Sequence, residues 1–274
     1  MKFRTVMANL ALDRSNNACL AVTGDLAQRL GAHVIGIAAS DLKPPLYYAE
    51  GEQAEAIFRQ ERTAIRERIG QLEKTFRARL ADKSKGLEWR SAIDLSTRFI
   101  STQARAADIL VIQVGAEPTD PYSGADPTDL VMTTGRPLLV VPESVDWLDT
   151  RHILVAWKDT REARRAIVDA LPLLSLATEV TIVEILEEGS TRSAAQSRLK
   201  DVASWLQQHG LSAETLVIDQ PEDVTMRLDE AASDAGAGVI VAGAYGHSRF
   251  REWVLGGVTR HLVTQQKRCI LLSR

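Results

Sequence analysis

The chain has 274 residues, of which 45% are hydrophobic and 25% are charged, and its formal net charge is −3. This length and composition predict two domains or one large one, with enough apolar residues for a sizeable core. The slight negative charge argues against a general nucleic-acid-binding role, which usually needs a basic face. No apolar run approaches the roughly 20 residues of a membrane span, and no long apolar region follows the first residues, so we expect a cytoplasmic protein that binds neither membranes nor nucleic acid.

The two cysteines, Cys19 and Cys269, lie in opposite halves of the sequence and form no CxxC or CxxH cluster. A disulfide framework or a zinc site is therefore not expected, and both residues are interpreted as buried free thiols. The sequence also contains no paired catalytic carboxylates within one motif and no GxxxxGK[ST] loop.

The first half alternates apolar strands with periodic helices. Gly31 is expected to end the first helix, which begins after the capping residues 13–16. Strands are expected at 5–8, 34–39, 87–92, 108–112 and 137–141, with 87–92 the weakest and most peripheral. Helices are expected at 18–30, 52–80 and 96–106, and a short one is expected after the loop 118–127.

The pattern begins again near residue 151, which indicates an internal repeat. The paired stretches are 151–157 with 3–9, 162–177 with the first helix, 179–185 with the second strand, 237–241 with 107–111, and 268–272 with 136–140. Two alternating units predict parallel, doubly wound sheets. We expect the units to span 1–145 and 150–274, joined by a polar stretch.

Glycines cluster after the buried strand 239–242 and before a helix that opens at Arg260. Such glycines let the backbone approach a phosphate group closely, and a helix N-terminus offers free N–H groups and the positive end of a dipole. Ligands of doubly wound sheets bind beyond the carboxyl ends of the strands, where the winding reverses. The strands that end at Ala242 and near Trp157 are therefore expected to border a binding crevice.

The spacing Gly243-x-x-Gly246, nine residues, then Gly256 resembles the nucleotide-binding signature of the universal stress protein family. The resemblance covers both halves, as a tandem pair of such domains. It implies an α/β fold with two five-stranded parallel sheets of the adenine nucleotide α-hydrolase-like type, paired about a pseudo-two-fold axis through their last strands. It also implies that the second unit binds ATP or a related adenine nucleotide, with Mg²⁺ accompanying the ATP.

Carried over by position, the resemblance places the base and ribose at two strand ends and the phosphates at the glycine loop and the following helix. Tyr245 either stacks on the ligand or packs on the loop. No catalytic residue and no metal ligand is assigned. The assigned residues are Ala156, Trp157, Lys158, Val183, Gly243, Tyr245, Gly246, Gly256, Gly257, Val258 and Thr259.

Two residues depart from the family pattern. Lys158 stands where nucleotide-binding members often have an aspartate, and Asp159 follows one residue later. Gly257 replaces the usual serine or threonine after the third glycine, which removes one side-chain donor but keeps the backbone N–H. Loss of one hydrogen bond to a charged group costs about 1.5–3 kcal/mol, or roughly tenfold to hundredfold in affinity. A lysine in the crevice could offset part of this loss or change the ligand preference.

The first unit departs further from the signature. Gln113 and Ala116 stand at the positions of the first two glycines, and Gly124 stands at the third. Asp120 and Asp126 bring negative charge to the same loop. Since like charge repels phosphate, we expect the first unit not to bind nucleotide.

Three functions stay open at this point. The first is a regulatory stress-response protein that binds ATP and acts on an unknown protein partner. The second is a tandem scaffold with a vestigial glycine loop, which acts through protein or small-ligand interactions. The third is an enzyme of the wider adenine nucleotide α-hydrolase-like architecture, although the catalytic constellation is missing. For the first function, no residue is obviously placed to activate water, so ATP hydrolysis is expected to be slow at most. A homodimer of the tandem chain is compatible but not required, because pairing of the last strands within one chain already satisfies those edges.

Overall fold

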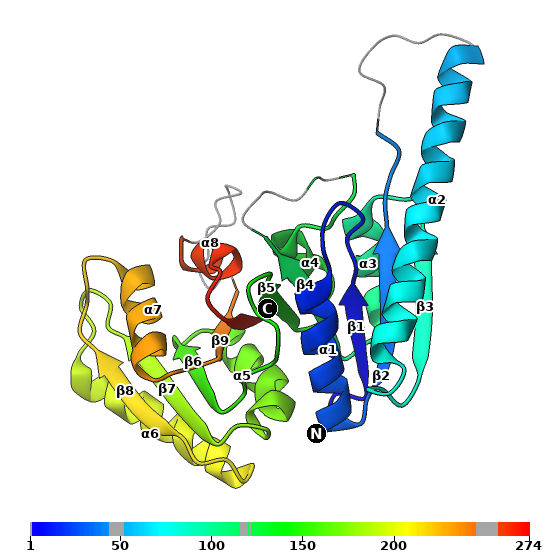
Figure 1. Ribbon diagram of the computed structural model, residues 1–274. Coiled ribbons are helices and arrows are strands. Elements are labelled where there is room, and N and C mark those ends of the chain that lie inside the picture. Colours follow the sequence, from blue (N-terminus) through cyan, green and yellow to red (C-terminus); the bar gives the residue numbers. More distant parts are fainter. Residues whose placement is uncertain (1, 44–51, 116–119, 121, 245–256) are drawn as a thin grey trace.

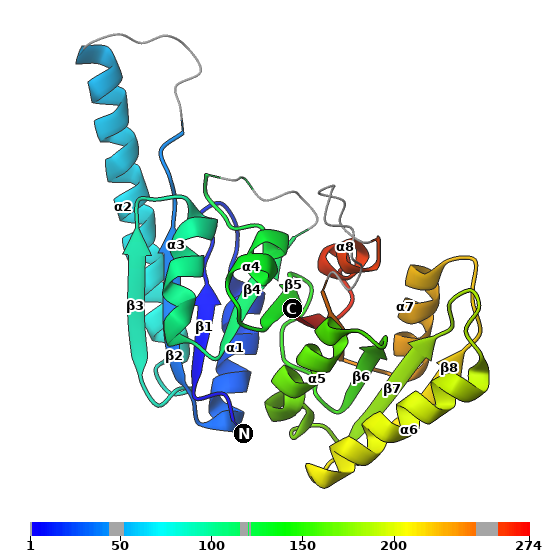
Figure 2. The ribbon, with the colours of Figure 1, turned by 180° about the vertical axis from the view of Figure 1, so that it is seen from behind.

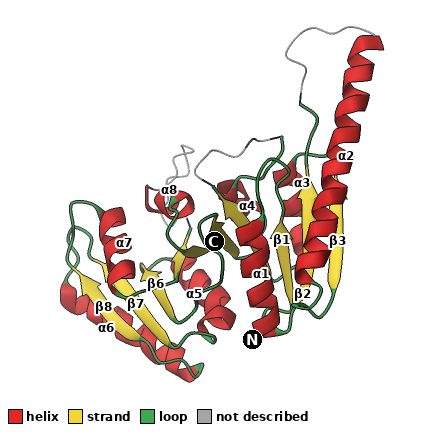
Figure 3. Cartoon of the chain, viewed as in Figure 1, coloured by secondary structure: helices red, strands yellow, loops and turns green. Residues whose placement is uncertain are grey.

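The computed structural model describes the chain except residues 1, 44–51, 116–119, 121 and 245–256. The described residues contain one sheet of ten strands, with helices packed on both faces (Figures 1 and 2). The order of the strands across the sheet is β3-β2-β1-β4-β5-β10-β9-β6-β7-β8. Figure 3 shows the alternation of strands and helices that the sequence predicts.

The first five strands form one half of this sheet. Helix α2 and strand β3 begin and end at the predicted residues, whereas the third predicted helix is shorter and is followed by a single 3-10 turn at Ala104–Ala106. The elements in chain order are β1 (Thr5–Asn9), α1 (Asn17–Leu30), β2 (His33–Ala39), α2 (Glu52–Leu80), β3 (Leu87–Ala92), α3 (Ser96–Gln103), β4 (Ile109–Val114), α4 (Pro127–Thr133) and β5 (Leu138–Pro142).

The other five strands repeat this arrangement. The repeat includes a helix, a strand and a further helix between β7 and β9, whose individual bounds are not predicted from the sequence. The elements are β6 (His152–Trp157), α5 (Arg161–Leu174), β7 (Glu179–Ile185), α6 (Arg192–Gln208), β8 (Glu214–Ile218), α7 (Val224–Asp234), β9 (Val239–Gly243), α8 (Gly257–Thr264) and β10 (Cys269–Ser273).

The two halves meet through their last strands. Strands pair in parallel within each half, but β5 and β10 pair antiparallel, with Leu139 opposite Leu271 at the centre. The expected pairing within one chain is confirmed, and it merges the two five-stranded sheets into one continuous sheet. Both strands are buried along their whole length, so this junction is part of the core.

Side-chain alternation divides the core into two layers, because successive residues of a strand face opposite sides. On one face, Val239 and Val241 belong to the layer formed with α1, α2, α5 and α6. On the other face, Ile240 and Ala242 belong to the layer formed with α3, α4, α7 and α8. The near-continuous apolar strands are thus explained by burial on both faces, as is usual in parallel sheets.

The sheet register corrects one detail of the predicted repeat. Thr5 pairs with His33 at the start of β2, and His152 pairs with Glu179 at the start of β7, so Thr5 corresponds to His152. The stretches 151–157 and 3–9 are therefore one residue out of phase. A shift of one residue exchanges the two faces of a strand, and apolarity on both faces hides that exchange from the sequence.

Two predicted helix features can be followed in Figure 1. Helix α1 ends at Gly31, whose φ of 63° is the left-handed conformation that glycine adopts without strain. Helix α2 extends well beyond the strands on which its second half packs. Among the described residues no helix combines the length and the apolar content of a membrane span, and α2 has charges along its whole length.

Candidate functional site

The winding of the second half reverses at β6, which lies between β7 and β9. Ala156, near the end of β6, pairs in register with Val183 of β7 and with Ala242 of β9. The predicted neighbourhood of the two strand ends is therefore confirmed. This reversal point is the edge at which sheets of this kind bind ligands.

Two of the residues assigned to the base lie on the same face of the sheet. Val183 is buried and Ala156 is half-buried, and both belong to the layer that includes Leu262 of α8. Val258, in the first turn of α8, packs on the same layer. Helix α8 thus lies on the same face of the sheet as Ala156 and Val183.

Trp157 lies on the opposite face. It is 8% exposed and belongs to the layer under α5 and α6. Its Nε1 is buried and has no hydrogen-bond partner within the described part of the chain. The structure therefore separates the Trp157 side chain from Ala156 and Val183, although the three are assigned to one ligand from the sequence.

Lys158 follows β6 and forms an ion pair with Glu187, which follows β7. Asp159, the candidate replacement for the family aspartate, forms an ion pair with Arg164 of α5. At this end of β6, each of these charged groups is therefore already matched by a group of the opposite sign.

Gly243 is required by helix packing. A Cβ atom at this position would lie 2.6 Å from the backbone N of Ala163 and 2.6 Å from the carbonyl carbon of Glu162, in the first turn of α5. Contacts this short are repulsive, so only glycine allows β9 and α5 to approach so closely. The sequence predicts a role for Gly243 in a phosphate cradle, whereas the structure gives it a reason that involves no ligand.

Glu162 is a charged residue of this same contact, and its side chain is buried. Burial disfavours its ionisation, but hydrogen bonds from Arg161, from its own backbone N–H and from Thr160 hold its pKa below the usual range. A carboxylate at the N-terminus of α5 is further stabilised by the helix dipole. The positive end of the α5 dipole is thus already compensated by the Glu162 carboxylate.

The start of α8 is open by comparison, as far as the described residues surround it. Gly257 is exposed, and a Cβ atom there would meet no described atom within 4 Å. Thr259 is buried. Tyr245, Gly246 and Gly256 lie outside the described residues. Of the glycine-loop positions assigned from the sequence, Gly257 is the described one that has space for an approaching group.

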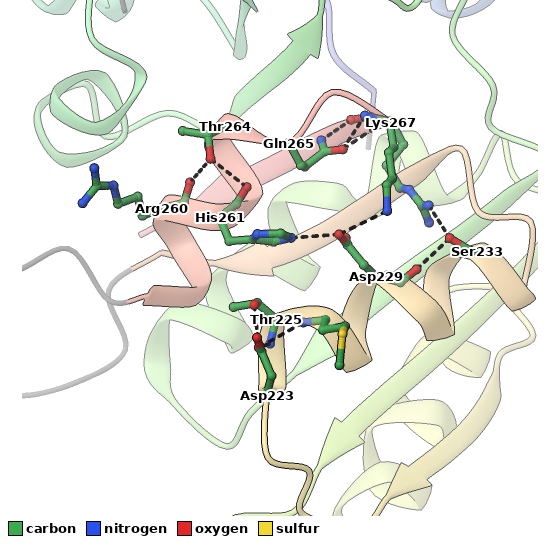
Figure 4. A network of polar contacts seen from close by, with 11 residues as sticks. Asp223, Thr225, Asp229, Ser233, Arg260, His261, Thr264, Gln265 and Lys267 are labelled. Atoms are coloured by element: carbon green, nitrogen blue, oxygen red, sulfur yellow. Dashed lines mark hydrogen bonds and ion pairs between the residues drawn. The ribbon is translucent and has the colours of Figure 1, made fainter. Parts of the chain in front are cut away.

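Arg260 also lies in the first turn of α8. The sequence identifies it only as the residue at which this helix begins and assigns it no ligand contact. Its side chain is exposed and has no hydrogen bond or ion pair among the described residues. Figure 4 shows it turned away from the contact between α7 and α8, toward which His261 points. Arg260 could have been identified as a candidate phosphate contact from the sequence, because a basic residue three positions after Gly257 lies in the first turn of the helix. Side chains of that turn flank the free backbone N–H groups.

The first half differs at the equivalent of Gly243. Val6 pairs with Ile109 as Ile153 pairs with Val239, so Gln113 takes the position of Gly243. Its Oε1 accepts a hydrogen bond of 3.1 Å from the backbone N–H of Cys19, and its Nε2 donates one of 2.8 Å to the carbonyl of Ser15. In the first half a long side chain therefore bonds to the start of α1, at the position where glycine lets the α5 backbone approach the strand in the second half.

The two aspartates of the first-unit loop, Asp120 and Asp126, also interact with nearby groups of the chain. Asp120 forms an ion pair with Lys43, and Asp126 accepts a 2.7 Å hydrogen bond from the backbone N–H of Thr128 as the N-cap of α4. Ala116 lies outside the described residues. Gly124 is buried, and its backbone N–H donates to the carbonyl of Asp120.

Comparison with solved structures identifies the fold. A universal stress protein from Archaeoglobus fulgidus DSM 4304 aligns with a TM-score of 0.74 at 12% identity, over 98% of this chain and 96% of that one. The chain has the fold of a tandem universal stress protein.

Two further structures match this tandem universal stress fold over 99% of the chain. A putative universal stress protein from Pseudomonas aeruginosa UCBPP-PA14 has a TM-score of 0.61 at 14% identity, with 93% of that chain covered. A functionally unknown protein from Pseudomonas aeruginosa PAO1 has a TM-score of 0.62 at 13% identity, with 92% covered. No family model and no curated protein matches the sequence. At these identities the likeness establishes the fold.

Proposed function

We propose that this chain is a member of the universal stress protein family that binds ATP, or a related adenine nucleotide, in its second half. The observation that supports this most strongly is the open start of α8. This helix lies on the same face of the sheet as Ala156 and Val183, which flank the point at β6 where the winding reverses. At the start of α8, Gly257 leaves space beside the helix N-terminus, and Arg260 adds a positive charge that no described residue pairs. Free N–H groups, a positive dipole end and a cation together suit a phosphate chain.

In this proposal the base lies beside Ala156 and Val183, and the phosphates lie at Gly257, Val258 and Thr259, whose backbone N–H groups are among those left free at the start of α8. Arg260 offsets the loss of the hydrogen bond that a hydroxyl at position 257 would donate. No three His, Cys, Asp or Glu side chains of the described chain come together as a metal site, so a Mg²⁺ ion would be held chiefly by the phosphates of ATP.

The proposed role is regulatory and cytoplasmic. Bound nucleotide would change the surface that a protein partner recognises, and turnover of ATP would be slow at most. The proposal makes the first half a partner domain without nucleotide, because Gln113 fills the position of the first glycine.

A second candidate, a scaffold that binds no nucleotide, is favoured by two observations. First, the close approach of α5 explains why residue 243 is glycine without any ligand. Second, the ion pair of Lys158 with Glu187 bridges the ends of β6 and β7 beside the proposed base site. A ligand that enters there must be accommodated beside this pair or must separate it.

Calorimetric titration of the full chain with ATP tests the proposal. Gly257→Glu places a negative charge at the start of α8, where a Cβ atom would meet no described atom within 4 Å and where an acidic residue favours the helix. At about 5 Å from a phosphate, the repulsion is worth about 1–3 kcal/mol, or roughly fivefold to hundredfold in affinity. Gly70→Glu is the matched control, because a Cβ atom at Gly70 on α2 would also meet no described atom within 4 Å.

The proposal predicts micromolar binding of ATP by the wild type and by Gly70→Glu, and weaker binding by Gly257→Glu. Absence of heat up to millimolar ATP would favour the scaffold. A Gly243→Val variant is unsuitable for this test, since its side chain would collide with the α5 backbone whether or not ATP binds.

A further inference from the structure

A groove lies between α7 and α8, apart from the proposed nucleotide site. Its volume is about 440 Å³, within the range of roughly 300–1,000 Å³ that small-molecule sites occupy, and it is open to solvent. Figure 4 shows Asp223, Asp229 and Ser233 along α7, with His261 reaching across from α8. The ionisable side chains that line the groove are Asp223, Asp229, Glu230, Asp234, His261 and Lys267.

Asp229 is the buried group of this set, with 7% of its surface exposed. Its Oδ2 lies 2.8 Å from Nε2 of His261 and 3.6 Å from Nζ of Lys267. Its Oδ1 is buried and has no hydrogen-bond partner in the described part of the chain. A buried carboxylate oxygen without a partner is costly, so Asp229 would be stabilised by a further donor or cation that bonds to it directly.

The neighbouring cations compensate Asp229 only in part. Lys267 is 60% exposed at its side chain and lies beyond hydrogen-bond distance. Arg268 is buried beside α7, but it donates to the hydroxyl of Ser233 at 2.8 Å and leaves Nε and Nη1 without partners among the described residues. The Arg268 guanidinium therefore attracts the Asp229 carboxylate electrostatically, but its hydrogen bond goes to Ser233.

The carboxylates are spread along one helix. From Asp223 to Asp234 the rise of an α-helix amounts to roughly 16 Å, with Asp229 and Glu230 near the middle. Glu230 forms an ion pair with Arg227, with 2.9 Å between Oε2 and Nη1. The side chains of Glu230 and Asp234 are both exposed. Met226 is 57% exposed and adds an apolar surface within the groove.

We propose that this groove binds a linear polyamine. Ammonium groups separated by short methylene chains match carboxylates spread along α7, and the methylenes would contact Met226. One ammonium would replace the distant Lys267 at Asp229. A metal ion is a poorer match, because no three acidic or His ligands of the described residues converge on a point. This inference is independent of the proposed nucleotide function.

Calorimetric titration of the full chain with spermidine, at low and at about 0.15 M salt, tests the inference. Asp229→Asn keeps the size of the side chain and removes its charge, and we expect it to weaken spermidine binding about tenfold or more. Because Asp229 also holds α8, the double variant Glu230→Gln, Asp234→Asn provides a second test through exposed residues, and it should weaken binding about threefold to tenfold.

The matched control is the double variant Asp201→Asn, Glu214→Gln, which removes two exposed carboxylates from α6 and β8. It should bind spermidine within twofold of the wild type. Binding that is absent up to 10 mM spermidine, or that falls equally in the control, would overturn the inference. Tight binding of Mg²⁺ with the same dependence on Asp229 would overturn the assigned ligand class.

Discussion

Gly243→Ala provides the sharpest test of the packing that shapes the candidate site. The new Cβ would lie 2.6 Å from backbone atoms of Glu162 and Ala163, whereas ordinary contacts begin at 3.4 Å. Helix α5 must therefore retreat by about 0.8 Å, and its backbone cannot rotate aside as a side chain would. Overpacking of this kind costs about 1–3 kcal/mol.

Gly257→Ala is the matched control. The same methyl group at the start of α8 would meet no described atom within 4 Å. Since alanine has the higher helix propensity, this variant should be as stable as the wild type or more stable by up to about 1 kcal/mol. The two variants make the same chemical change, so their difference isolates the close approach at Gly243.

Thermal unfolding followed by tryptophan fluorescence measures both variants. For chains of comparable size about 1 kcal/mol shifts Tm by roughly 2–4 °C, so Gly243→Ala should melt about 2–12 °C below the wild type. Equal stability of Gly243→Ala and Gly257→Ala would refute the argument that α5 imposes glycine at residue 243.

Three further predictions follow from single groups. Burial raises the pKa of the Cys19 and Cys269 thiols to about 12, so iodoacetamide at about pH 8 should modify neither in the native chain and both after denaturation, as mass spectrometry would show. Arg260→Ala should weaken ATP binding by roughly tenfold while leaving adenosine binding within twofold, and equal losses for both ligands would contradict a phosphate contact. Because the pKa of Glu162 is depressed in the folded chain, its stabilising effect is present above its unfolded pKa of about 4.3 and is lost as the pH falls through its folded value. Glu162→Gln should therefore be less stable than the wild type at about pH 7 and approach it at about pH 3, and a constant difference across that range would contradict the assignment.

Much of the fold could be predicted because strong local patterns coincide with buried elements. The sequence predicts the long periodic stretch 52–80 and the strand 179–185 with their observed bounds, since apolar spacing and flanking turn residues agree there. The pairing of β5 with β10 is what the family resemblance implies, and the structure confirms it.

The details that were missed depend on contacts between distant segments. Gly243 owes its identity to α5, which lies about 80 residues earlier in the sequence. The contact of Asp229 with His261 joins α7 to α8 across 32 positions. The sequence predicts the phase of β1 against β6 wrongly by one residue, because strands that are apolar on both faces show no alternation. Such features become visible only when the helices are placed against the sheet.

The central claim is that the start of α8 holds the phosphates of a nucleotide, and Gly257→Ser tests it most directly. A serine Cβ would meet no described atom within 4 Å, and the substitution returns the hydroxyl donor of the family pattern to this position. Calorimetric titration with ATP should show about tenfold tighter binding by Gly257→Ser than by the wild type, because one hydrogen bond to a charged group is gained. Equal or weaker binding by the variant would contradict the claim.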